Sequence, residues 1–185
     1  HKNNFRLDIF PEYKSHRKKV RKPIIVKPLK EYMFHNYETL TYPNLEGDDV
    51  CGIFATQSLN KDKVVILSGD KDLRTIPGIH HFIHDESTEV VNENIADYNF
   101  MYQTLVGDMT DGFAGCPSIG GVKASRILAN KKDLPEMWEA VVKEYEKQGL
   151  DEAYALTQAR LARILRAQDW DSKRKKPILW RPNAK

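Results

Sequence analysis

The chain has 185 residues, of which 41% are hydrophobic and 10% aromatic, and its formal net charge at pH 7 is +3. This length and composition predict a folded protein with one good core or two small ones. No run approaches the ~18 apolar residues needed to cross a bilayer, so we expect a soluble, cytoplasmic protein with no membrane contact. Cys51 and Cys116 lack CxxC spacing, which predicts neither a zinc site nor a disulfide framework.

The charge is unevenly distributed along the chain. The first 30 residues carry ten Lys or Arg against two acids, a net charge of +8, and the remaining 155 residues sum to −5. A basic arm joined to an acidic body is expected of a protein that holds a polyanion with one part and metal ions with the other. On charge alone, an ordinary solvated tail is an equally good interpretation.

The basic arm includes residues 5–22, where aromatic side chains stand among the cations. They offer stacking surfaces for bases beside charges for phosphates, and they are Phe5, Phe10 and Tyr13. After Pro11, cations recur at three- and four-residue spacing up to Pro23, at Lys14, Arg17, Lys18 and Arg21. A helix here would present a cationic stripe, and because like charges repel, we expect it to order on an anionic partner.

Residues 23–26 and 38–42 are weak strand candidates, and residues 32–37 fit either a helix or a loop. From Asp48 onward the apolar spacing predicts an amphipathic helix. Its first turn gathers three acids, Glu46, Asp48 and Asp49, which the helix dipole partly stabilises. Such acids can simply cap a helix, but three so close together are more typical of ligands for a divalent cation.

Residues 64–67, a continuous β-branched and apolar run, predict a fully buried central strand of a parallel sheet. Asp70 and Asp72 follow it, at the carboxyl end where open α/β sheets place their ligands. A turn in which one Asp caps the next segment is the alternative.

The histidines of residues 80–84 alternate with apolar residues, which favours a sheet surface over a metal site. A helix is predicted over residues 97–105. A second pair of acids, Asp108 and Asp111, follows it among glycines that allow tight backbone turns.

Residues 115–124, GCPSIGGVKA, form the most specific stretch of the chain. Gly120 and Gly121 permit a tight hairpin at the start of a helix over about residues 122–131, where exposed N–H groups bind phosphate. Lys123 adds a positive charge. A Gly-Gly turn by itself would more often be only a connector.

Two more helices are predicted, one from Pro135 to Gln148 and one capped by Asp151. In the second, Leu161, Ile164 and Leu165 are expected to face the core. The arginines between them, Arg160, Arg163 and Arg166, are expected to form a solvated face. We expect Trp180 to tie down the C-terminal tail.

Taken together, the order and spacing of these motifs resemble the 5′-nuclease (flap endonuclease) superfamily, most closely the small bacteriophage 5′-3′ exonucleases. FRLDIFPEYKSHRKK resembles the arch of that family, and GCPSIGGVKAS its helix-three-turn-helix; the acidic motifs are LEGDDV, SGDKD and GDMTDG. The resemblance implies an α/β fold with a mostly parallel central sheet, a PIN-like nuclease core. This core would span residues 1–107 with the arch at 5–22, and an all-helical DNA-binding subdomain and tail would span 108–185.

The resemblance also implies roles for individual residues. Lys14 and Arg17 would be catalytic, contacting the region of the scissile phosphate. Seven acids would hold two Mg²⁺ or Mn²⁺ ions: Glu46, Asp48, Asp49, Asp70, Asp72, Asp108 and Asp111. DNA contacts would come from Arg6, Tyr13, Lys18, Ser118, Gly120, Gly121 and Lys123, with K⁺ held by the hairpin carbonyls in some members.

One departure concerns the start of the family pattern, a strand bearing an Asp ligand followed by another acid, which this chain does not contain. We therefore expect a truncated or separately encoded portion, a partner chain that supplies the missing strand, or a degenerate paralogue. The favoured function is metal-dependent hydrolysis of DNA at 5′ ends or flaps, in the host cytoplasm if the protein is phage-encoded. The alternatives are a duplex-binding module with an incomplete metal site, and a PIN-like ribonuclease without the hairpin.

Overall fold

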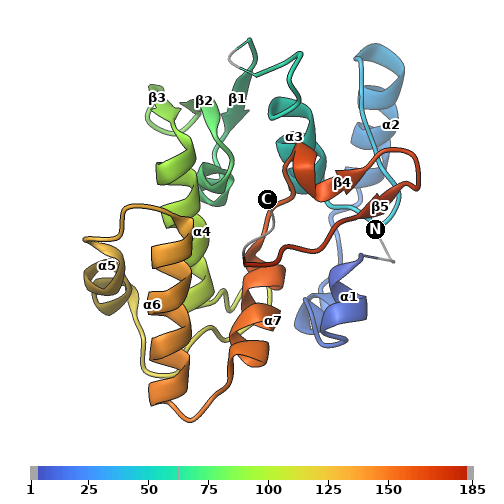
Figure 1. Cartoon of the computed structure of the whole chain (residues 1–185). Helices are drawn as coiled ribbons and strands as arrows, with labels where there is room; N and C mark the ends of the chain where they lie inside the picture. The colour runs from blue at the N-terminus through green and yellow to red at the C-terminus, as the bar shows by residue number, and fades with distance from the viewer. Residues whose placement is uncertain (1–3, 62, 183–185) are drawn as a thin grey trace.

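A computed structural model describes residues 4–61 and 63–182, without the side chains of Lys18 and Lys19. In chain order its elements are α1 (Arg6–Ile9), the 3₁₀ helix η1 (Ser15–Lys19), α2 (Val26–Asn36), α3 (Gly47–Ala55), β1 (Val65–Ser68), η2 (Lys71–Thr75), β2 (Gly78–Phe82), β3 (Ser87–Val91), α4 (Glu93–Val106), α5 (Gly121–Leu128), α6 (Leu134–Lys147), α7 (Glu152–Ala162), η3 (Ala167–Asp169), β4 (Trp170–Asp171) and β5 (Lys176–Pro177). Figure 1 shows the sheet and α3 above a group of packed helices. The α/β class predicted from the sequence is confirmed.

The main sheet has the strand order β1-β2-β3, with β1 parallel to β2 and β2 antiparallel to β3. Within the described part of the chain, β1 is an edge strand and only one of its faces is covered. Ile66 is buried, whereas Val65 and Leu67 are 56% and 64% exposed. The prediction of a fully buried central strand is therefore wrong here, because a β-branched run specifies a strand but not how many of its faces are covered.

The helical region is built around α4, which packs against α5, α6 and α7. The predicted caps are present, since the Asp151 side chain accepts a hydrogen bond from the Tyr154 N–H at the start of α7. Trp180 lies edge-on to Phe100 and Trp138, with ring centroids 5.2 and 5.0 Å away, and so ties down the tail as expected. This core joins residues from both sides of position 107, and the proposed division there stays a prediction.

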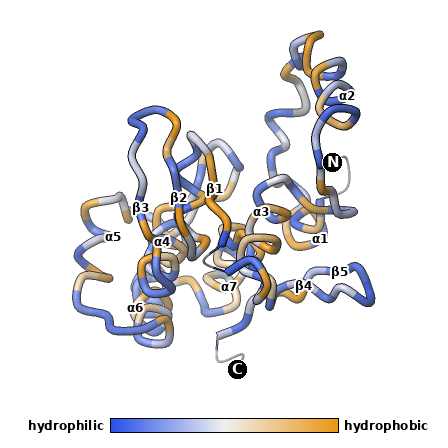
Figure 2. Tube along the Cα trace, turned by 90° about the horizontal axis from the view of Figure 1, so that it is seen from above, coloured by the Kyte–Doolittle hydropathy of each residue, from blue (hydrophilic) through white to orange (hydrophobic). Residues whose placement is uncertain are grey.

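The basic segment differs from its prediction. Instead of a helix reaching Pro23, the chain makes a short 3₁₀ turn at η1 and then forms α2 beyond the proline, where strand-like residues 23–26 were expected. Residues 38–42 form no strand, and most of 32–37 are helical. Repulsion among adjacent cations disfavours a regular helix before Pro23. Figure 2 shows α2 projecting away from the rest of the molecule, and none of its residues is buried.

The arginine row predicted as a solvated face is instead largely buried. α7 ends at Ala162, and Arg163 and Arg166 are 2% and 4% exposed. Their guanidinium groups pair with Asp169 and Asp97 at 2.8 Å, respectively. The prediction was wrong because it extended helical spacing past the end of the helix.

Two minor sequence predictions agree with the structure. His80 and His81 lie in strand β2, as the strand-like pattern predicted, and His80 is buried there with its Nε2 2.8 Å from the carbonyl oxygen of Ile76. Both cysteines are free thiols. Among the described residues, no helix combines the length and apolarity that a bilayer span requires.

Candidate active site

A cleft of about 200 Å³ gathers six of the seven predicted acids, and we call it the acid cleft. Its acidic lining residues are Glu46, Asp48, Asp70, Asp72, Asp108 and Asp111. Lys14 and Arg17 line the same cleft. The structure therefore brings the predicted acids and catalytic cations together, while their roles as ligands and phosphate contacts stay predictions.

Three separate segments deliver the six acids. Glu46 is the N-cap of α3 and Asp48 lies in the first turn of that helix. Asp70 follows β1 and caps η2, because its side chain accepts the N–H of Asp72 at 2.9 Å. The Asp70 side chain therefore caps this turn, as one interpretation of the sequence predicted. Asp70 and Asp72 also both line the cleft, as the other interpretation requires.

The third segment is the turn after α4, which holds Asp108 and Asp111. Gly107 begins the turn at φ 73°, and a Cβ there would lie 2.4 Å from the backbone of Ala114. Only glycine fits this close approach. The turn closes when the Asp108 N–H donates to the carbonyl of Phe113 at 2.9 Å.

The carboxylates raise one another's pKa. Burial is the largest cause for Asp48, followed by Asp70 and Glu46, and together they raise the pKa of Asp48 to about 6. The pKa of Asp72 is raised by burial and then by Asp70 and Asp108. The excess of negative charge in the cleft and its all-oxygen donor set fit hard divalent cations such as Mg²⁺ or Mn²⁺.

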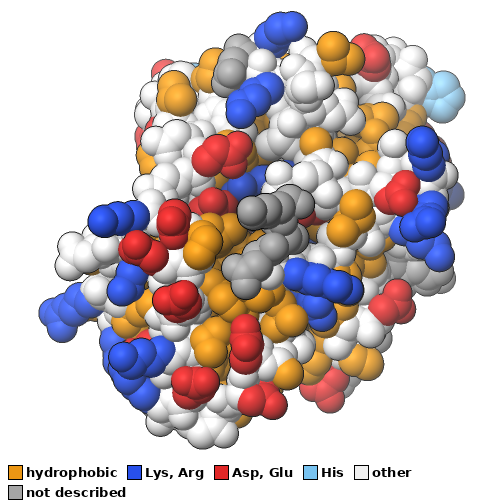
Figure 3. Space-filling view, viewed as in Figure 1, with side chains coloured by type: hydrophobic (Ala, Val, Ile, Leu, Met, Phe, Trp, Pro, Cys, Tyr) orange, Lys and Arg blue, Asp and Glu red, His pale blue; other side chains and the backbone are white. Residues whose placement is uncertain are grey.

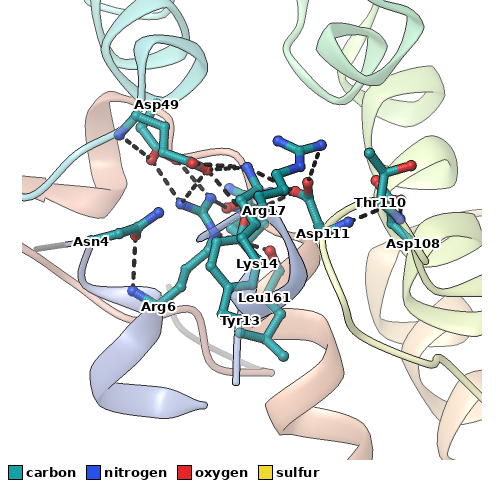
Figure 4. A network of polar contacts seen from close by, with 12 residues as sticks. Asn4, Arg6, Tyr13, Lys14, Arg17, Asp49, Asp108, Thr110, Asp111 and Leu161 are labelled. Carbon is teal, nitrogen blue, oxygen red and sulfur yellow. Dashed lines mark hydrogen bonds and ion pairs between the residues drawn. The ribbon is translucent and has the colours of Figure 1, made fainter. Parts of the chain in front are cut away.

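Two protein cations pair with acids of the cleft, and Figure 4 shows Lys14 and Arg17 beside Asp111. The Lys14 Nζ lies 2.8 Å from Glu46 Oε1 and 3.2 Å from Asp111 Oδ2, and Arg17 lies 3.3 Å from Asp111 Oδ1. The Tyr13 hydroxyl is 3.0 Å from Glu46 and 2.8 Å from Asp111. Among the residues that the structure describes, no three His, Cys, Asp or Glu side chains therefore converge as they stand to hold one ion.

Three predicted site residues are buried, two of them at the lining of the cleft and Asp49 behind it. Asp49 is fully buried, its carboxylate accepts two hydrogen bonds of 2.8 Å from Arg6, and it does not line the cleft, while its role as a metal ligand stays a prediction. Arg6 and Tyr13 are 2% and 3% exposed. Both still line the acid cleft with this small exposed surface, and their predicted DNA contacts stay predictions.

The remaining predicted DNA contacts lie at α5. Gly120 is its N-cap, and Ser118 and Lys123 are exposed nearby. Gly121 is required by packing, since a Cβ there would lie 2.4 Å from the Tyr102 hydroxyl oxygen. Figure 3 shows Lys and Arg side chains over α5 and α6, interspersed with acids. The side chain of Lys18 lies outside the described residues.

Sequence reasoning missed two residues that line the cleft, Gln103 and Thr110. Gln103 comes from α4 and hydrogen-bonds Asp72, which lowers the pKa of that carboxyl. Nothing in the local sequence marks Gln103. The Thr110 N–H donates to Asp108 Oδ1 at 2.6 Å, a turn that the D-x-T spacing is typical of and that could have been found.

Comparison with known proteins places the chain among nucleases. The family model described as "5'-3' exonuclease, N-terminal resolvase-like domain" matches residues 1–101. The exonuclease of Escherichia phage T7 is 31% identical over 213 residues, covering 97% of this chain and 71% of that protein. The exodeoxyribonuclease of Enterobacteria phage T3 is 29% identical over 215 residues, covering 98% and 71%.

Solved structures share the fold. The D15 protein of bacteriophage T5, co-crystallised with metal ions, superposes with a TM-score of 0.63 at 16% identity, over 86% of this chain and 71% of that chain. The T5 D15 flap endonuclease in a pseudo-enzyme-product complex with DNA and metal ions also gives a TM-score of 0.63, at 17% identity, over 86% and 70%. With the family match over more than half of its residues, the chain belongs to the 5′-3′ exonuclease family.

Proposed function

We propose that the chain is a metal-dependent nuclease that hydrolyses phosphodiester bonds at 5′ ends or flaps of duplex DNA. The observation that carries the proposal is the convergence of six carboxylates from three segments on one cleft that also contains Lys14 and Arg17. The names of the phage T3 and T7 relatives, and the DNA and metal ions in the T5 D15 complex, support the same activity.

We propose two divalent ions, Mg²⁺ or Mn²⁺, as cofactors. When bound, they would supply an activated water and charge stabilisation of the leaving oxygen in an in-line displacement. Glu46 and Asp48 would serve one ion, Asp72, Asp108 and Asp111 the other, and Asp70 would lie between them. Asp49 has no place in this set because it is buried against Arg6.

Lys14 and Arg17 would steady the scissile phosphate. Both cations already face carboxylates in the acid cleft, so a phosphate entering it could replace those partners with little movement of the chain. Farther from the cut, exposed N–H groups at the start of α5, with Lys123, would hold duplex phosphates as a helix-three-turn-helix. Hairpin carbonyls there would hold a K⁺ ion.

The test is hydrolysis of 5′-labelled duplex and flap DNA in the presence of Mg²⁺. The double variant Asp70→Asn, Asp72→Asn should lose nearly all product, since both side chains line the cleft. The double variant Asp85→Asn, Glu86→Gln removes two charges from the exposed β2–β3 turn and should cut normally. Product formation by the first variant would reject the assignment.

A second candidate, a module that binds duplex DNA without cutting it, is favoured by one observation. No three acids of the described residues lie grouped to hold one ion, and β1 pairs only with β2 there, which leaves its other edge for pairing with a strand of a partner chain. This candidate predicts salt-sensitive duplex binding in EDTA and no Mg²⁺-stimulated product. Cutting of single-stranded RNA in preference to duplex DNA would instead indicate a PIN-like ribonuclease.

A further inference from the structure

A buried ion pair joins Arg6, at the lining of the acid cleft, to Asp49 behind it. Arg6 Nη1 and Nη2 each lie 2.8 Å from one oxygen of the Asp49 carboxylate. Arg6 is 2% exposed and Asp49 is fully buried. The Arg6 guanidinium also stacks 4.5 Å above the centroid of the Phe5 ring. Asp49 does not line the cleft, and Arg6 lines it with its guanidinium already paired to that carboxylate.

The pair joins three parts of the chain that are distant in sequence. Asp49 Oδ2 accepts the N–H of Glu46 at 3.1 Å, and Asp49 Oδ1 accepts the N–H of Leu165 at 3.2 Å. Arg6 donates to the carbonyls of Leu161 and Arg163 at 3.0 and 2.6 Å. The two side chains therefore connect α1, the start of α3 and the segment after α7.

The contact with Glu46 matters for the acid cleft. Asp49 is the N3 residue of a capping box whose N-cap is Glu46, so it fixes the backbone that carries this cleft acid, and Asp48 lies in the same turn. Arg6 Nη1 is itself 3.7 Å from Glu46 Oε2. A shift of the ion pair would thus move two acids of the cleft together.

The buried ion pair is better explained by the positions that it fixes than by the stability that it adds. Apolar residues of similar volume often replace a buried ion pair without loss of stability, because desolvation offsets most of the attraction. The hydrogen bonds of Asp49 to two backbone amides are directional, however, and an apolar side chain cannot make them. What the pair adds beyond an apolar core is therefore a fixed position for the first turn of α3.

We propose that Arg6 and Asp49 are positioning residues that hold Glu46 and Asp48 in place for the divalent ion. This inference rests on the proposed metal site and deepens it. In this role, Arg6 and Asp49 contact neither the ion nor the DNA. Their effect reaches the cleft through the backbone of Glu46 and the first turn of α3.

The experiment uses the double variant Arg6→Met, Asp49→Leu, which leaves no unpaired buried charge. It removes the acceptor of the Glu46 and Leu165 amides, so circular dichroism first establishes that the variant is folded. Mn²⁺ binding is measured by calorimetry, and DNA hydrolysis as a function of Mn²⁺ concentration. We expect Mn²⁺ affinity to fall about 10- to 100-fold, as for other residues that orient metal ligands. At saturating Mn²⁺ we expect kcat to recover to within about threefold, because no ligand has been lost.

The matched control is Tyr145→Phe, which removes a buried hydrogen bond of 2.6 Å to the carbonyl of Thr104 in the helical core. It should lower stability but leave Mn²⁺ affinity unchanged. Unchanged Mn²⁺ affinity in the folded double variant would overturn the inference. Loss of one bound Mn²⁺ per chain, with no recovery of kcat, would also overturn it by making Asp49 a ligand.

If the wild-type chain binds no Mn²⁺, the proposed function is rejected. Amide hydrogen exchange then tests separately whether Arg6 and Asp49 fix the backbone at Glu46. The amides of Glu46 and Leu165 both donate to Asp49. In the double variant they should exchange at least tenfold faster while amides of α6 keep their rates. Unaltered exchange at Glu46 would overturn the positioning role.

Discussion

Lys14 links two carboxylates of the acid cleft without a metal ion. Its ammonium contacts Glu46 and Asp111, which come from α3 and from the turn after α4. A divalent ion held by these acids would have to displace this ammonium. Lys14 therefore competes with metal for the same oxygen atoms, and in the proposed reaction it serves the phosphate instead.

Lys14→Met should consequently bind Mn²⁺ more tightly than the wild type in the absence of DNA. The expected gain is about two- to fivefold, since partly exposed ion pairs contribute up to ~1 kcal/mol. The same variant should cut DNA far more slowly because the phosphate loses a contact. Calorimetry and hydrolysis assays check the two effects, with Lys22→Met, an exposed cation of the same segment, as the control. Weaker Mn²⁺ binding by Lys14→Met would contradict the competition.

Asp48 gives a pH-dependent prediction. Its pKa in the folded chain, about 6, lies above the ordinary value of 3.8, so ionised Asp48 destabilises the metal-free fold. The penalty is full above about pH 6, declines between pH 6 and 4, and is absent below both values. Asp48→Asn should therefore raise the Tm in EDTA at pH 7.5 and lose this advantage near pH 4. Because Asp48 is partly exposed, the gain should be only ~1 kcal/mol.

Thermal melts of both proteins across this pH range measure the effect, and Glu86→Gln, in the exposed β2–β3 turn, is the control. A lower Tm for Asp48→Asn at pH 7.5 would show that the acids of the cleft are already compensated by Lys14 and Arg17.

For single residues, the sequence predicted most of the acids that line the cleft, but it did not predict which acidic side chain is buried instead. Asp48 and Asp49 are neighbours, but successive helical residues point about 100° apart, so one lines the cleft and the other is buried. The motif alone does not show which of the two side chains lines the cleft and which is buried. The partner that decides the matter, Arg6, lies 43 positions away, and nothing local to Asp49 reveals it.

At the scale of elements, the start of α5 separates packing from DNA contact. Gly121 lies against Tyr102, whereas no atom lies within 4 Å of a Cβ added at Gly120. Gly121→Ala should therefore destabilise the protein by ~1–3 kcal/mol through overpacking, and displacement of α5 should weaken duplex binding in EDTA. Gly120→Ala should leave stability nearly unchanged, and it serves as the matched control. Melts and binding assays on both variants test this, and equal stability of the two would refute the packing role.

The helices that the sequence predicted best are those with caps and apolar spacing in the same stretch, such as α6 and α7. The sequence prediction was wrong where the helical spacing of one stretch was assumed to continue past the end of the helix. Arg163 and Arg166 fall after the end of α7, in an extended segment where helical spacing no longer applies. The burial of β1 was likewise overestimated, because covering of a strand depends on distant residues and not on its own composition.

At the scale of the whole molecule, the acid cleft is the junction at which three parts of the chain that are distant in sequence meet. Its carboxylates come from the start of α3, the turn after β1 and the turn after α4, and they converge because each stands at the end of an element. The resemblance to the 5′-nucleases predicted this grouping of acids, whereas sheet geometry alone predicted only the position of Asp70 and Asp72 at the carboxyl end of β1. The path of the basic segment back over the cleft was not predictable, because it depends on tertiary contacts of Tyr13 and Lys14.

A divalent ion bound at this junction should stabilise the entire fold. Ligand bound only by the folded state adds about 2.7 kcal/mol at a concentration of one hundred times Kd, so Mn²⁺ should raise the wild-type Tm by several degrees over the value in EDTA. Asp70→Asn with Asp72→Asn should abolish most of this rise, while the exposed pair Asp85→Asn, Glu86→Gln should keep it. Scanning calorimetry with and without Mn²⁺ measures the three responses. An equal rise in all three proteins would place the ion elsewhere on the chain, and the acid cleft would then lose its assignment as the metal centre.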